Sequence, residues 1–532
     1  MALLLCSNTT GALGMKPLIF STMLCNSVIA ILLHITIILT WLLSFYISVF
    51  LHLHAVTNNI CGPAMMGLPA IYRAAGLLPT TVCIILVFLC SSLTGSLLSE
   101  SIQRLNNNKN FDKNIDFPRA FSEIVGHKWH MLVEVLVIIS CSVNACAGIV
   151  ETAQSLDSFL ASFVLGKTWG LGIPSMSLIE WDSSSCISAA ANGGHDSKLS
   201  SCTPFHHNKH DSIISLGYLI TTLAFYPLGR HDLKETIVVQ IISFLCFFLL
   251  IGQFLHEFSD RGFSDAATVP YIGSDMSQLA GVVLFNYAYP ITIPSWLNEK
   301  KPSVPVNSII WSASSISTVL YIVFGVLGAC SFANTGDDML ILLASNQVSY
   351  LTRISAAFFG VLIIGAGVPI FCVIVKNSLA TAKICNHDWS LFFGATLPYL
   401  VSWLMYQGTL LLTVVNWTGL VVNGSVAFIL PLVLAYCAIS YNSSSTDVDD
   451  IELQDKSTLN QYKYESINTN VDDADTAGGV TTEDEEKPSW VKPFPQFLES
   501  SRQPIILFAF FCFTTIVVGT IFLDLFTGAA PP

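Results

Sequence analysis

Residues 58–69 read Asn-Asn-Ile-Cys-Gly-Pro-Ala-Met-Met-Gly-Leu-Pro, and they fall inside a long apolar block. Pro63 has no amide hydrogen and its ring clashes with the preceding helical turn, while Gly62 permits backbone angles that other residues avoid. A helix through this block should therefore break near its middle. The break frees backbone amides and carbonyls that hydrocarbon cannot satisfy, so polar groups or a ligand must pair with them.

A second interruption follows about 225 residues later, where residues 285–294 read Phe-Asn-Tyr-Ala-Tyr-Pro-Ile-Thr-Ile-Pro. Pro290 and Pro294 again free backbone carbonyls, which suit an ammonium group. Each interruption opens a block of five apolar segments, and broken segments at corresponding positions of two halves indicate a transporter site between inverted repeats. The alternative is a pair of ordinary proline kinks, which membrane helices tolerate.

The composition of the whole chain places both interruptions in a membrane protein. Hydrophobic residues make up 52% of the chain and charged residues 11%, against about 25% charged in soluble domains. Apolar blocks such as residues 81–98, 237–255 and 505–526 are long enough for a helix to cross the hydrocarbon core, which takes about 20 residues. Strands of a membrane barrel would instead show alternating segments of about ten residues. We therefore expect an all-α, multi-pass membrane protein.

The apolar blocks divide the chain into four parts. Residues 1–50 form a divergent N-terminal segment, in which residues 26–50 are either an extra helix, a retained anchor, or a stretch translated from a wrong upstream start. Residues 51–440 are the core with its first ten spans, residues 441–501 are an acidic loop, and residues 502–532 hold the last span. The eleven expected core spans are residues 55–77, 79–103, 130–163, 212–230, 235–255, 278–297, 307–332, 351–376, 389–408, 411–439 and 503–526.

The net charge of −13 is local, because residues 441–501 hold fourteen acidic residues and four lysines. With few large apolar residues, this loop should be disordered. No basic patch points to nucleic acid.

Eleven Lys and Arg lie in one set of alternating short loops and three in the other, which puts the first set and the acidic loop in the cytoplasm. The loop 166–211 then faces outward, where Cys186 and Cys202 either form a disulfide or stay free thiols.

The predicted spans carry very few ionisable residues. Glu134 and Glu151 flank the third span, and Asp524 ends the last one. A site without charged side chains favours a zwitterion, with amides near residues 62–64 holding its carboxylate and carbonyls near residues 287–288 holding its ammonium. Asn144 is placed to face the same cavity. The predicted substrate site comprises Asn59, Gly62, Pro63, Ala64, Met66, Asn144, Asn286, Tyr287, Ala288 and Tyr289.

No cofactor or metal is expected, since the sequence has no CxxC or Cys/His metal spacing. A membrane enzyme is not expected either, because no nucleophile constellation or His/Asp/Glu cluster lies in the spans. Asn416 and Asn423 begin glycosylation sequons, but both fall within or against a predicted span, so we expect neither to be glycosylated.

Residues 62–76, Gly-Pro-Ala-Met-Met-Gly-Leu-Pro-Ala-Ile-Tyr-Arg-Ala-Ala-Gly, resemble the first helix of the amino acid/auxin permease family. That family shows G-x-G-I-L-x-L-P, then a short polar run and glycine; here Ala64 replaces the second glycine. Residues 285–300, an aromatic-rich stretch followed by proline, acid and lysine, resemble its sixth helix. Looser similarities are found at residues 117–126, 321–332, 397–398 and 419–431. The resemblance covers residues 52–440 and the last span.

This resemblance implies a LeuT-type fold of eleven helices, two inverted five-helix repeats plus one, with substrate bound where helices one and six unwind. It also implies coupling to protons or sodium. A sodium site would need oxygens from helix eight, which corresponds to residues 351–376. This helix offers only Thr352 and Ser355, both near its end, so we favour proton coupling or facilitated movement. The expected function is transport of small neutral amino acids across a plasma, vacuolar or endosomal membrane. The alternative is an amino-acid sensor that signals through the acidic loop to a protein partner that the sequence does not identify.

Overall fold

The structure is a computed structural model in which the chain divides at residue 53, and all residues described below belong to the unit that begins there. The described residues are 57, 60, 63–105, 108–113, 115–182, 204–205, 212–231, 233–263, 268–300, 304–333, 335, 339–345, 348–382, 384–407, 410–439, 491–494 and 501–526. Residues 26–50, for which an extra helix is one of the alternatives, Cys186 and Cys202, and most of the acidic loop lie outside them.

Seven helices of the described chain are long and apolar enough to cross a membrane, so the prediction of a helical, multi-pass membrane protein is confirmed at this level. Five belong to uninterrupted or nearly uninterrupted α-helices: α4 (Leu77–Gln103), α6 (His127–Phe159), α9 (Leu233–Arg261), α12 (Val306–Ser331) and α20 (Arg502–Phe526). The span of α6 ends in a π-helical turn, η2 (Leu160–Val164), and the other two spans contain longer π-helical turns. One joins α14 (Tyr350–Phe358), η6 (Phe359–Gly365) and α15 (Ala366–Thr381), and the other joins α18 (Leu410–Trp417), η8 (Thr418–Ile429) and helical residues 430–439.

The remaining expected spans are helical too, but they are short or broken. They are η1 (Pro63–Gly67) with α3 (Leu68–Ala75), α8 (Leu216–Arg230), α10 (Leu279–Asn286) with η5 (Tyr289–Thr292) and α11 (Ile293–Glu299), and α16 (His387–Leu391) with η7 (Phe392–Thr396) and α17 (Leu397–Leu404). Two short helices, α5 (Phe117–Ile124) and α13 (Met339–Leu343), lie in the predicted linkers. The polar linkers are therefore partly structured.

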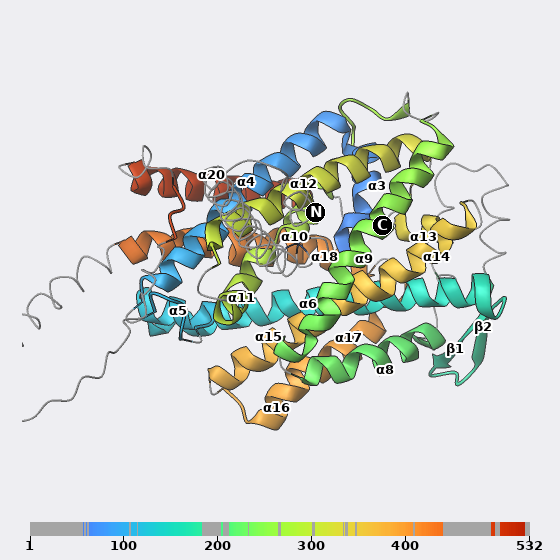
Figure 1. Cartoon of the computed structure of the whole chain (residues 1–532), viewed down its shortest axis with the longest axis horizontal. Helices are drawn as coiled ribbons and strands as arrows, with labels where there is room; N and C mark the ends of the chain where they lie inside the picture. The colour runs from blue at the N-terminus through green and yellow to red at the C-terminus, as the bar shows by residue number, and fades with distance from the viewer. Residues whose placement is uncertain are drawn as a thin grey trace, which may run out of the picture. The chain divides into compact units, whose positions relative to one another are not determined.

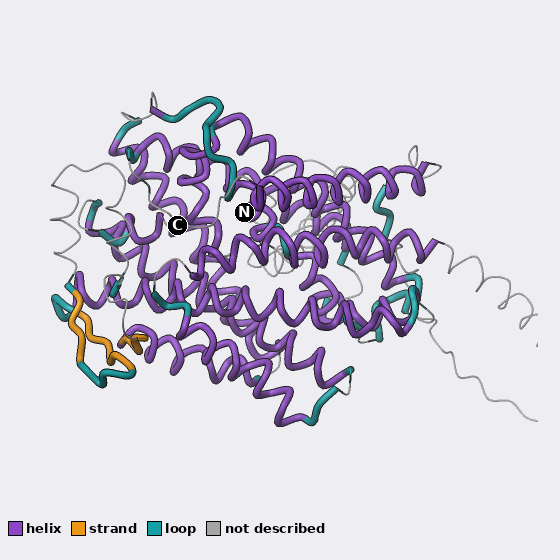
Figure 2. Tube along the Cα trace, turned by 180° about the vertical axis from the view of Figure 1, so that it is seen from behind, coloured by secondary structure: helices purple, strands orange, loops and turns teal. Residues whose placement is uncertain are grey.

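A small antiparallel sheet corrects the expectation of a purely helical chain. Strands β1 (Thr168–Ile173), β2 (Leu178–Trp181) and β3 (Ser212–Ser215) pair in the order β2-β1-β3 and lie together at one end of the helices (Figure 2). The span expected at about residues 212–230 begins as a helix four residues later, at Leu216. Residues 212–215 alternate between half-buried and buried positions, which is the period of a strand.

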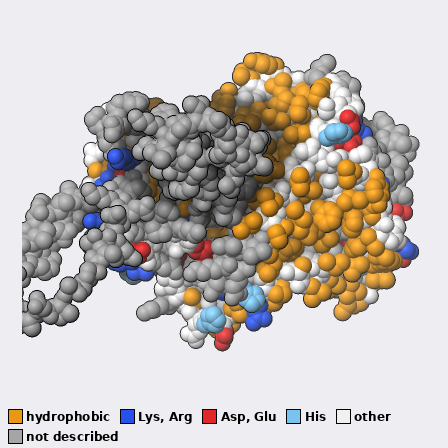
Figure 3. All heavy atoms as spheres, viewed as in Figure 1, with side chains coloured by type: hydrophobic (Ala, Val, Ile, Leu, Met, Phe, Trp, Pro, Cys, Tyr) orange, Lys and Arg blue, Asp and Glu red, His pale blue; other side chains and the backbone are white. Residues whose placement is uncertain are grey.

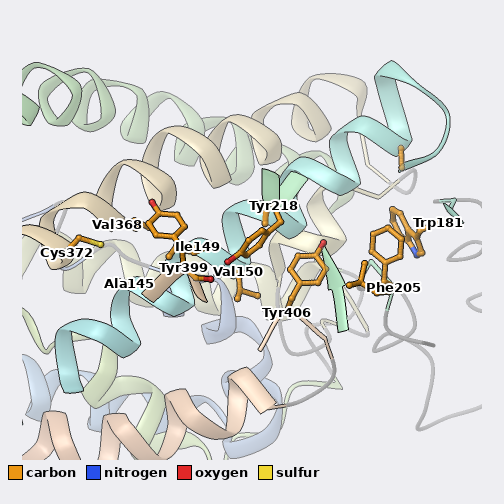
Figure 4. Packing of buried hydrophobic residues seen from close by; sticks show 13 residues of the cluster. Ala145, Ile149, Val150, Trp181, Phe205, Tyr218, Val368, Cys372, Tyr399 and Tyr406 are labelled. Atoms are coloured by element: carbon orange, nitrogen blue, oxygen red, sulfur yellow. Dashed lines mark hydrogen bonds between the residues drawn. The ribbon is translucent and has the colours of Figure 1, made fainter. Parts of the chain in front are cut away.

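Helix α6 lies among the other helices of the unit and packs against α8, α15, α17, η6 and η8. In Figure 1 it runs between α10 and α18 on one side and α15, α17 and α8 on the other, with α5 near one end and β1 and β2 near the other. Its C-terminal half joins a buried cluster that includes Trp181, Tyr218, Tyr399 and Tyr406 (Figure 4). The rings of Tyr218 and Tyr406 meet edge to face, with centroids 6.3 Å apart.

The surface of this unit suits a bilayer. Leu223, Leu249 and Phe508 are 77%, 75% and 71% exposed to solvent. Hydrophobic side chains cover a broad area of the described face in Figure 3, and charged side chains lie toward its margins. A soluble protein would not leave so many large apolar residues exposed, because they would drive association.

Candidate functional site

The second predicted interruption is present in the structure. Helix α10 ends at Asn286, Tyr287 and Ala288 leave the helical path with φ/ψ of −99°/17° and −75°/7°, and a 3-10 turn begins at Tyr289. Pro290 explains the local geometry, because a continuing α-helix would need an amide hydrogen at residue 290 to bond the carbonyl of Asn286. The helix resumes only at Ile293.

The backbone carbonyls at this interruption are partly engaged by the protein itself. The carbonyl of Tyr287 accepts a hydrogen bond from Ser91 Oγ at 2.8 Å. The carbonyl of Ala288 accepts one from the amide of Ile291 at 3.3 Å. A carbonyl oxygen has two lone pairs, so accepting one hydrogen bond does not by itself prevent it from accepting a second donor such as an ammonium.

The first interruption is described at Thr57, at Ile60 and from Pro63 onward. Residues Pro63–Gly67 form a 3-10 turn, and the α-helix starts at Leu68. Met66, predicted in the site, is buried. Predicted residues Asn59 and Gly62 lie outside the described residues, and for Pro63 and Ala64 the backbone alone is described. The segment is thus not a continuous α-helix through Pro63.

The structure brings the two interruptions together. The 3-10 turn η1 packs against both α10 and α6. Helix α12 then holds each of them: the Tyr321 hydroxyl donates to the carbonyl of Ile60, and its ring meets that of Tyr287 edge to face at 5.5 Å. Tyr287 and Tyr289 also bond to Thr318 and Ser314 of α12, at 2.6 and 2.7 Å. Two segments far apart in sequence therefore form one buried junction.

Helix α6 contributes polar groups to the same region. Asn144, predicted in the site, is buried and its Nδ2 donates to the carbonyl of Ser140 at 2.8 Å. Ser140 Oγ donates to Asn423 Oδ1 of η8 at 2.5 Å. One turn along, Ala147, Phe285 and Val415 form an apolar cluster between α6, α10 and α18. The junction thus has a polar layer next to an apolar layer.

The residues predicted for ion coupling lie on α14. Thr352 is fully buried, donates to Glu257 Oε2 at 2.8 Å and accepts from Gln253 Nε2 at 3.1 Å, both on α9. Ser355 is buried one turn further along. The hydroxyl of Thr352 therefore joins α14 to α9, and a role in ion binding stays a prediction.

Sequence reasoning missed several buried polar residues. Asp157 of α6 is fully buried and accepts hydrogen bonds from Thr168, Ser215, Gly217 and Tyr406. Its position inside the expected span 130–163 was a signal that could have found it. Glu100 of α4 is likewise buried; it pairs with Arg502 of α20 and, at 2.7 Å, with Arg104.

A small cavity of about 50 Å³ lies away from this junction, between α5, α6 and α15. Asp116, at the start of α5, lines it. Burial raises the pKa of this carboxyl above its usual value, while Arg119 and a hydrogen bond from Thr381 act in the opposite direction. Glu134 and His130 of α6 also line the cavity. Among the described residues, no group of His, Cys, Asp or Glu is arranged to hold a metal ion.

These features define a multi-pass helical membrane protein with two interrupted helices meeting at a buried polar junction. The chain belongs to the transmembrane amino acid transporter protein family, whose sequence profile matches residues 46–447, more than half of the chain. The expected family resemblance is thereby confirmed. The protein is a member of a transporter family and not an enzyme. A search of curated proteins gave no match to the chain.

Proposed function

We propose that the protein is a secondary transporter that moves small neutral amino acids across a membrane by alternating access. The observation that carries this proposal is the junction of the two interruptions, where η1 packs against α10 beside the polar face of α6. Broken helices that meet inside a membrane bundle are typical of sites that hold an amino acid by its backbone groups. Family membership supports the amino acid as cargo.

In this proposal the eleven expected core spans form a LeuT-type fold of two inverted five-helix repeats plus one. Backbone amides around residues 62–64 hold the carboxylate of the substrate, since the start of a helical turn attracts an anion. Carbonyls at residues 286–288 hold the ammonium. The absence of an amide hydrogen at Pro290 supports the carbonyl of Asn286 as a member of this set.

Movement in the proposal separates two groups of helices. The segments η1–α3 and α10–η5–α11, together with α4 and α12, rock against α6, α8, α15 and α17. Contacts within each group support the division: α12 packs against α3 and α4, and α6 packs against α8, α15 and α17. Protons or sodium ions drive the cycle, at a plasma, vacuolar or endosomal membrane.

The decisive experiment is uptake of radiolabelled amino acids by proteoliposomes that contain the full-length protein. A panel of neutral, cationic and anionic amino acids is offered with and without sodium and pH gradients. We expect uptake of small neutral amino acids by the wild type and none by Gly62→Leu at equal reconstitution. Normal uptake by Gly62→Leu would refute the site, and no uptake by the wild type of any amino acid would refute transport.

A second candidate function is amino-acid sensing, and one observation favours it. Residues 491–494, at the end of the acidic loop, contact the core: the amide of Val491 bonds Gln103 Oε1 at 2.8 Å, and the carbonyl of Lys492 accepts from Asn307 Nδ2 at 2.9 Å. Phe494 is buried against Leu97 of α4 and Ile506 of α20. A signal at the core could reach the loop through these contacts. Deletion of residues 441–490 should leave the flux of a transporter intact but abolish partner binding by a sensor.

A further inference from the structure

Two buried amide side chains at the junction have one polar atom each for which the described part of the chain offers no hydrogen-bond partner. Asn423 of η8 is fully buried, and its Nδ2 is unpaired although its Oδ1 accepts from Ser140. Asn286, the last residue of α10, is 4% exposed, and its Oδ1 is unpaired although its Nδ2 donates to the carbonyl of Val282 at 3.1 Å. These two side chains therefore present one free donor and one free acceptor; Asn416 Oδ1 of α18, which also lies against α10, is a further buried acceptor without a partner among the described residues.

The backbones that carry these two side chains approach closely. A Cβ placed on Gly419 of η8 would lie 2.3 Å from the carbonyl oxygen of Gly281 and 3.1 Å from Phe285 Cβ. Asn286 directly follows Phe285, and Asn423 lies four residues, about one helical turn, beyond Gly419. The η5 turn also packs against η8. The two amides therefore lie on neighbouring turns of two helices in contact, beside the interrupted segment.

An unpaired buried polar atom is costly, so proteins rarely keep one without a use. Rotating the Asn423 amide by 180° does not remove the problem, because the Ser140 hydroxyl can pair with either group and the other is then left over. A ligand that offers both an acceptor and a donor would satisfy both side chains at once.

We propose that Asn423 and Asn286 contact the side chain of the transported amino acid, and that this side chain carries a carboxamide, as in glutamine or asparagine. The inference rests on the proposed transport function. The substrate's amide oxygen accepts from Asn423 Nδ2, and its amide nitrogen donates to Asn286 Oδ1. An aliphatic side chain leaves both atoms unpaired, and a carboxylate has no hydrogen for Asn286. Sites built to bond a polar group discriminate strongly against analogues that lack it.

The test compares glutamine with methionine, an unbranched side chain of similar length without the amide. Full-length protein in proteoliposomes is assayed for kcat/KM of uptake. The wild type should favour glutamine at least about tenfold, as expected for one unpaired buried group. Asn423→Leu keeps the size of the side chain and should bring the ratio close to one while methionine uptake persists. Ser425→Ala, on the same π segment, is the matched control, since its hydroxyl bonds Val421 of its own helix at 2.6 Å.

Equal uptake of methionine by the wild type, a preference for serine over glutamine, or an unchanged ratio in Asn423→Leu overturns the carboxamide site and leaves transport standing. Thermal unfolding of the purified protein with each amino acid separates the two proposals further. If no amino acid is taken up, yet glutamine alone stabilises the wild type and not Asn423→Leu, transport fails and the carboxamide site holds.

Discussion

The hydroxyl of Tyr321, midway along α12, donates a hydrogen bond to the backbone carbonyl of Ile60, three residues before the η1 turn begins. The same ring packs edge to face on Tyr287, the first residue after α10 ends. One side chain therefore contacts the backbone next to the first interruption and the side chain next to the second. Through it, the two broken segments and α12 are held as one group.

This relationship predicts that Tyr321→Phe removes the hydrogen bond to the carbonyl of Ile60 while leaving the ring packing on Tyr287 intact. Loss of one buried hydrogen bond should lower the free energy of unfolding by about 1 kcal/mol, and we expect slower amino acid uptake from a less ordered site. Thermal unfolding and proteoliposome uptake measure the two effects. Tyr271→Phe is the control, since Tyr271 is 66% exposed. Unchanged uptake by Tyr321→Phe would show that this bond does not order the site.

The second interruption gives a sharper prediction, because its cause is a missing hydrogen. Pro290→Ala restores an amide that can bond the carbonyl of Asn286 and extend α10. We expect uptake to fall at least about tenfold without loss of thermal stability, because the carbonyl proposed for the substrate ammonium becomes occupied.

Pro294→Ala is the matched control for this change. The amide of Ile293 already bonds the carbonyl of Pro290, so an added amide at residue 294 meets no carbonyl in need of a donor. Near-normal uptake is expected. If Pro290→Ala transports as well as Pro294→Ala, the backbone carbonyl of Asn286 is not part of the substrate site.

The sequence was sufficient to predict both interruptions, because each depends on proline chemistry that acts within one helical turn. Local rules also located the helical segments to within a few residues. The contacts that join the two interruptions could not be predicted from such local rules. Tyr321, Ser91 and Asn423 lie far from them along the chain, and only the packing of α12, α4 and η8 brings them close. Asn423 was interpreted only as the start of a sequon that is not glycosylated, because a neutral amide within an apolar block has no periodic signature.

Close packing between α10 and α18 leads to a third prediction. A Cβ on Gly281 would lie 1.9 Å from Asn416 Oδ1 and 2.7 Å from the backbone oxygen of the same residue. Because a backbone atom cannot move aside cheaply, Gly281→Ala should separate the two helices and lower the melting temperature by several degrees or prevent folding. Gly252→Ala, where no atom lies within 4 Å, should be neutral or slightly stabilising. Equal melting temperatures for the two variants would contradict the close approach.

Asp157 supports a fourth prediction, about the C-terminal end of α6. Its carboxylate accepts from Thr168 at 2.7 Å, from the amide of Gly217 at 2.9 Å and from Tyr406 at 2.5 Å, as well as from Ser215. Asp157→Ala leaves these donors unpaired in a buried place, and each unsatisfied buried donor costs about 1–3 kcal/mol, so we expect a loss of several kcal/mol in stability and a poor yield of folded protein.

Asp157→Asn should cost less than the alanine change, because its Oδ1 still accepts two of these bonds and the Ser215 and Tyr406 hydroxyls can turn to accept from its amide. Thermal unfolding ranks the variants. If alanine and asparagine destabilise equally, the hydrogen bonds to Asp157 are not what stabilises this end of the unit. The sheet itself was not foreseen, because its strands contain four to six residues and sit in a polar linker.

The pH dependence of stability supplies the last prediction, from two carboxylates outside the membrane spans. Burial raises the pKa of Asp116 above its ordinary 3.8. As pH rises through that ordinary value the unfolded chain releases this proton first, so the folded state loses stability until the raised pKa is passed. Asp116→Asn abolishes this loss. We therefore expect the variant to gain stability relative to the wild type as pH rises from 3 toward neutrality, as thermal unfolding in detergent measures it.

Glu180 is the opposite case, because hydrogen bonds from Lys167 and Trp169 lower its pKa. Its contribution is present above the ordinary pKa and disappears as pH falls through the lowered value, so Glu180→Gln should lose stability relative to the wild type as pH rises. When the stability of each variant minus that of the wild type is plotted against pH, the curves for Asp116→Asn and Glu180→Gln must therefore have opposite slopes. Slopes of the same sign would mean that the desolvation of Asp116 by α5 and α15 does not control its ionisation.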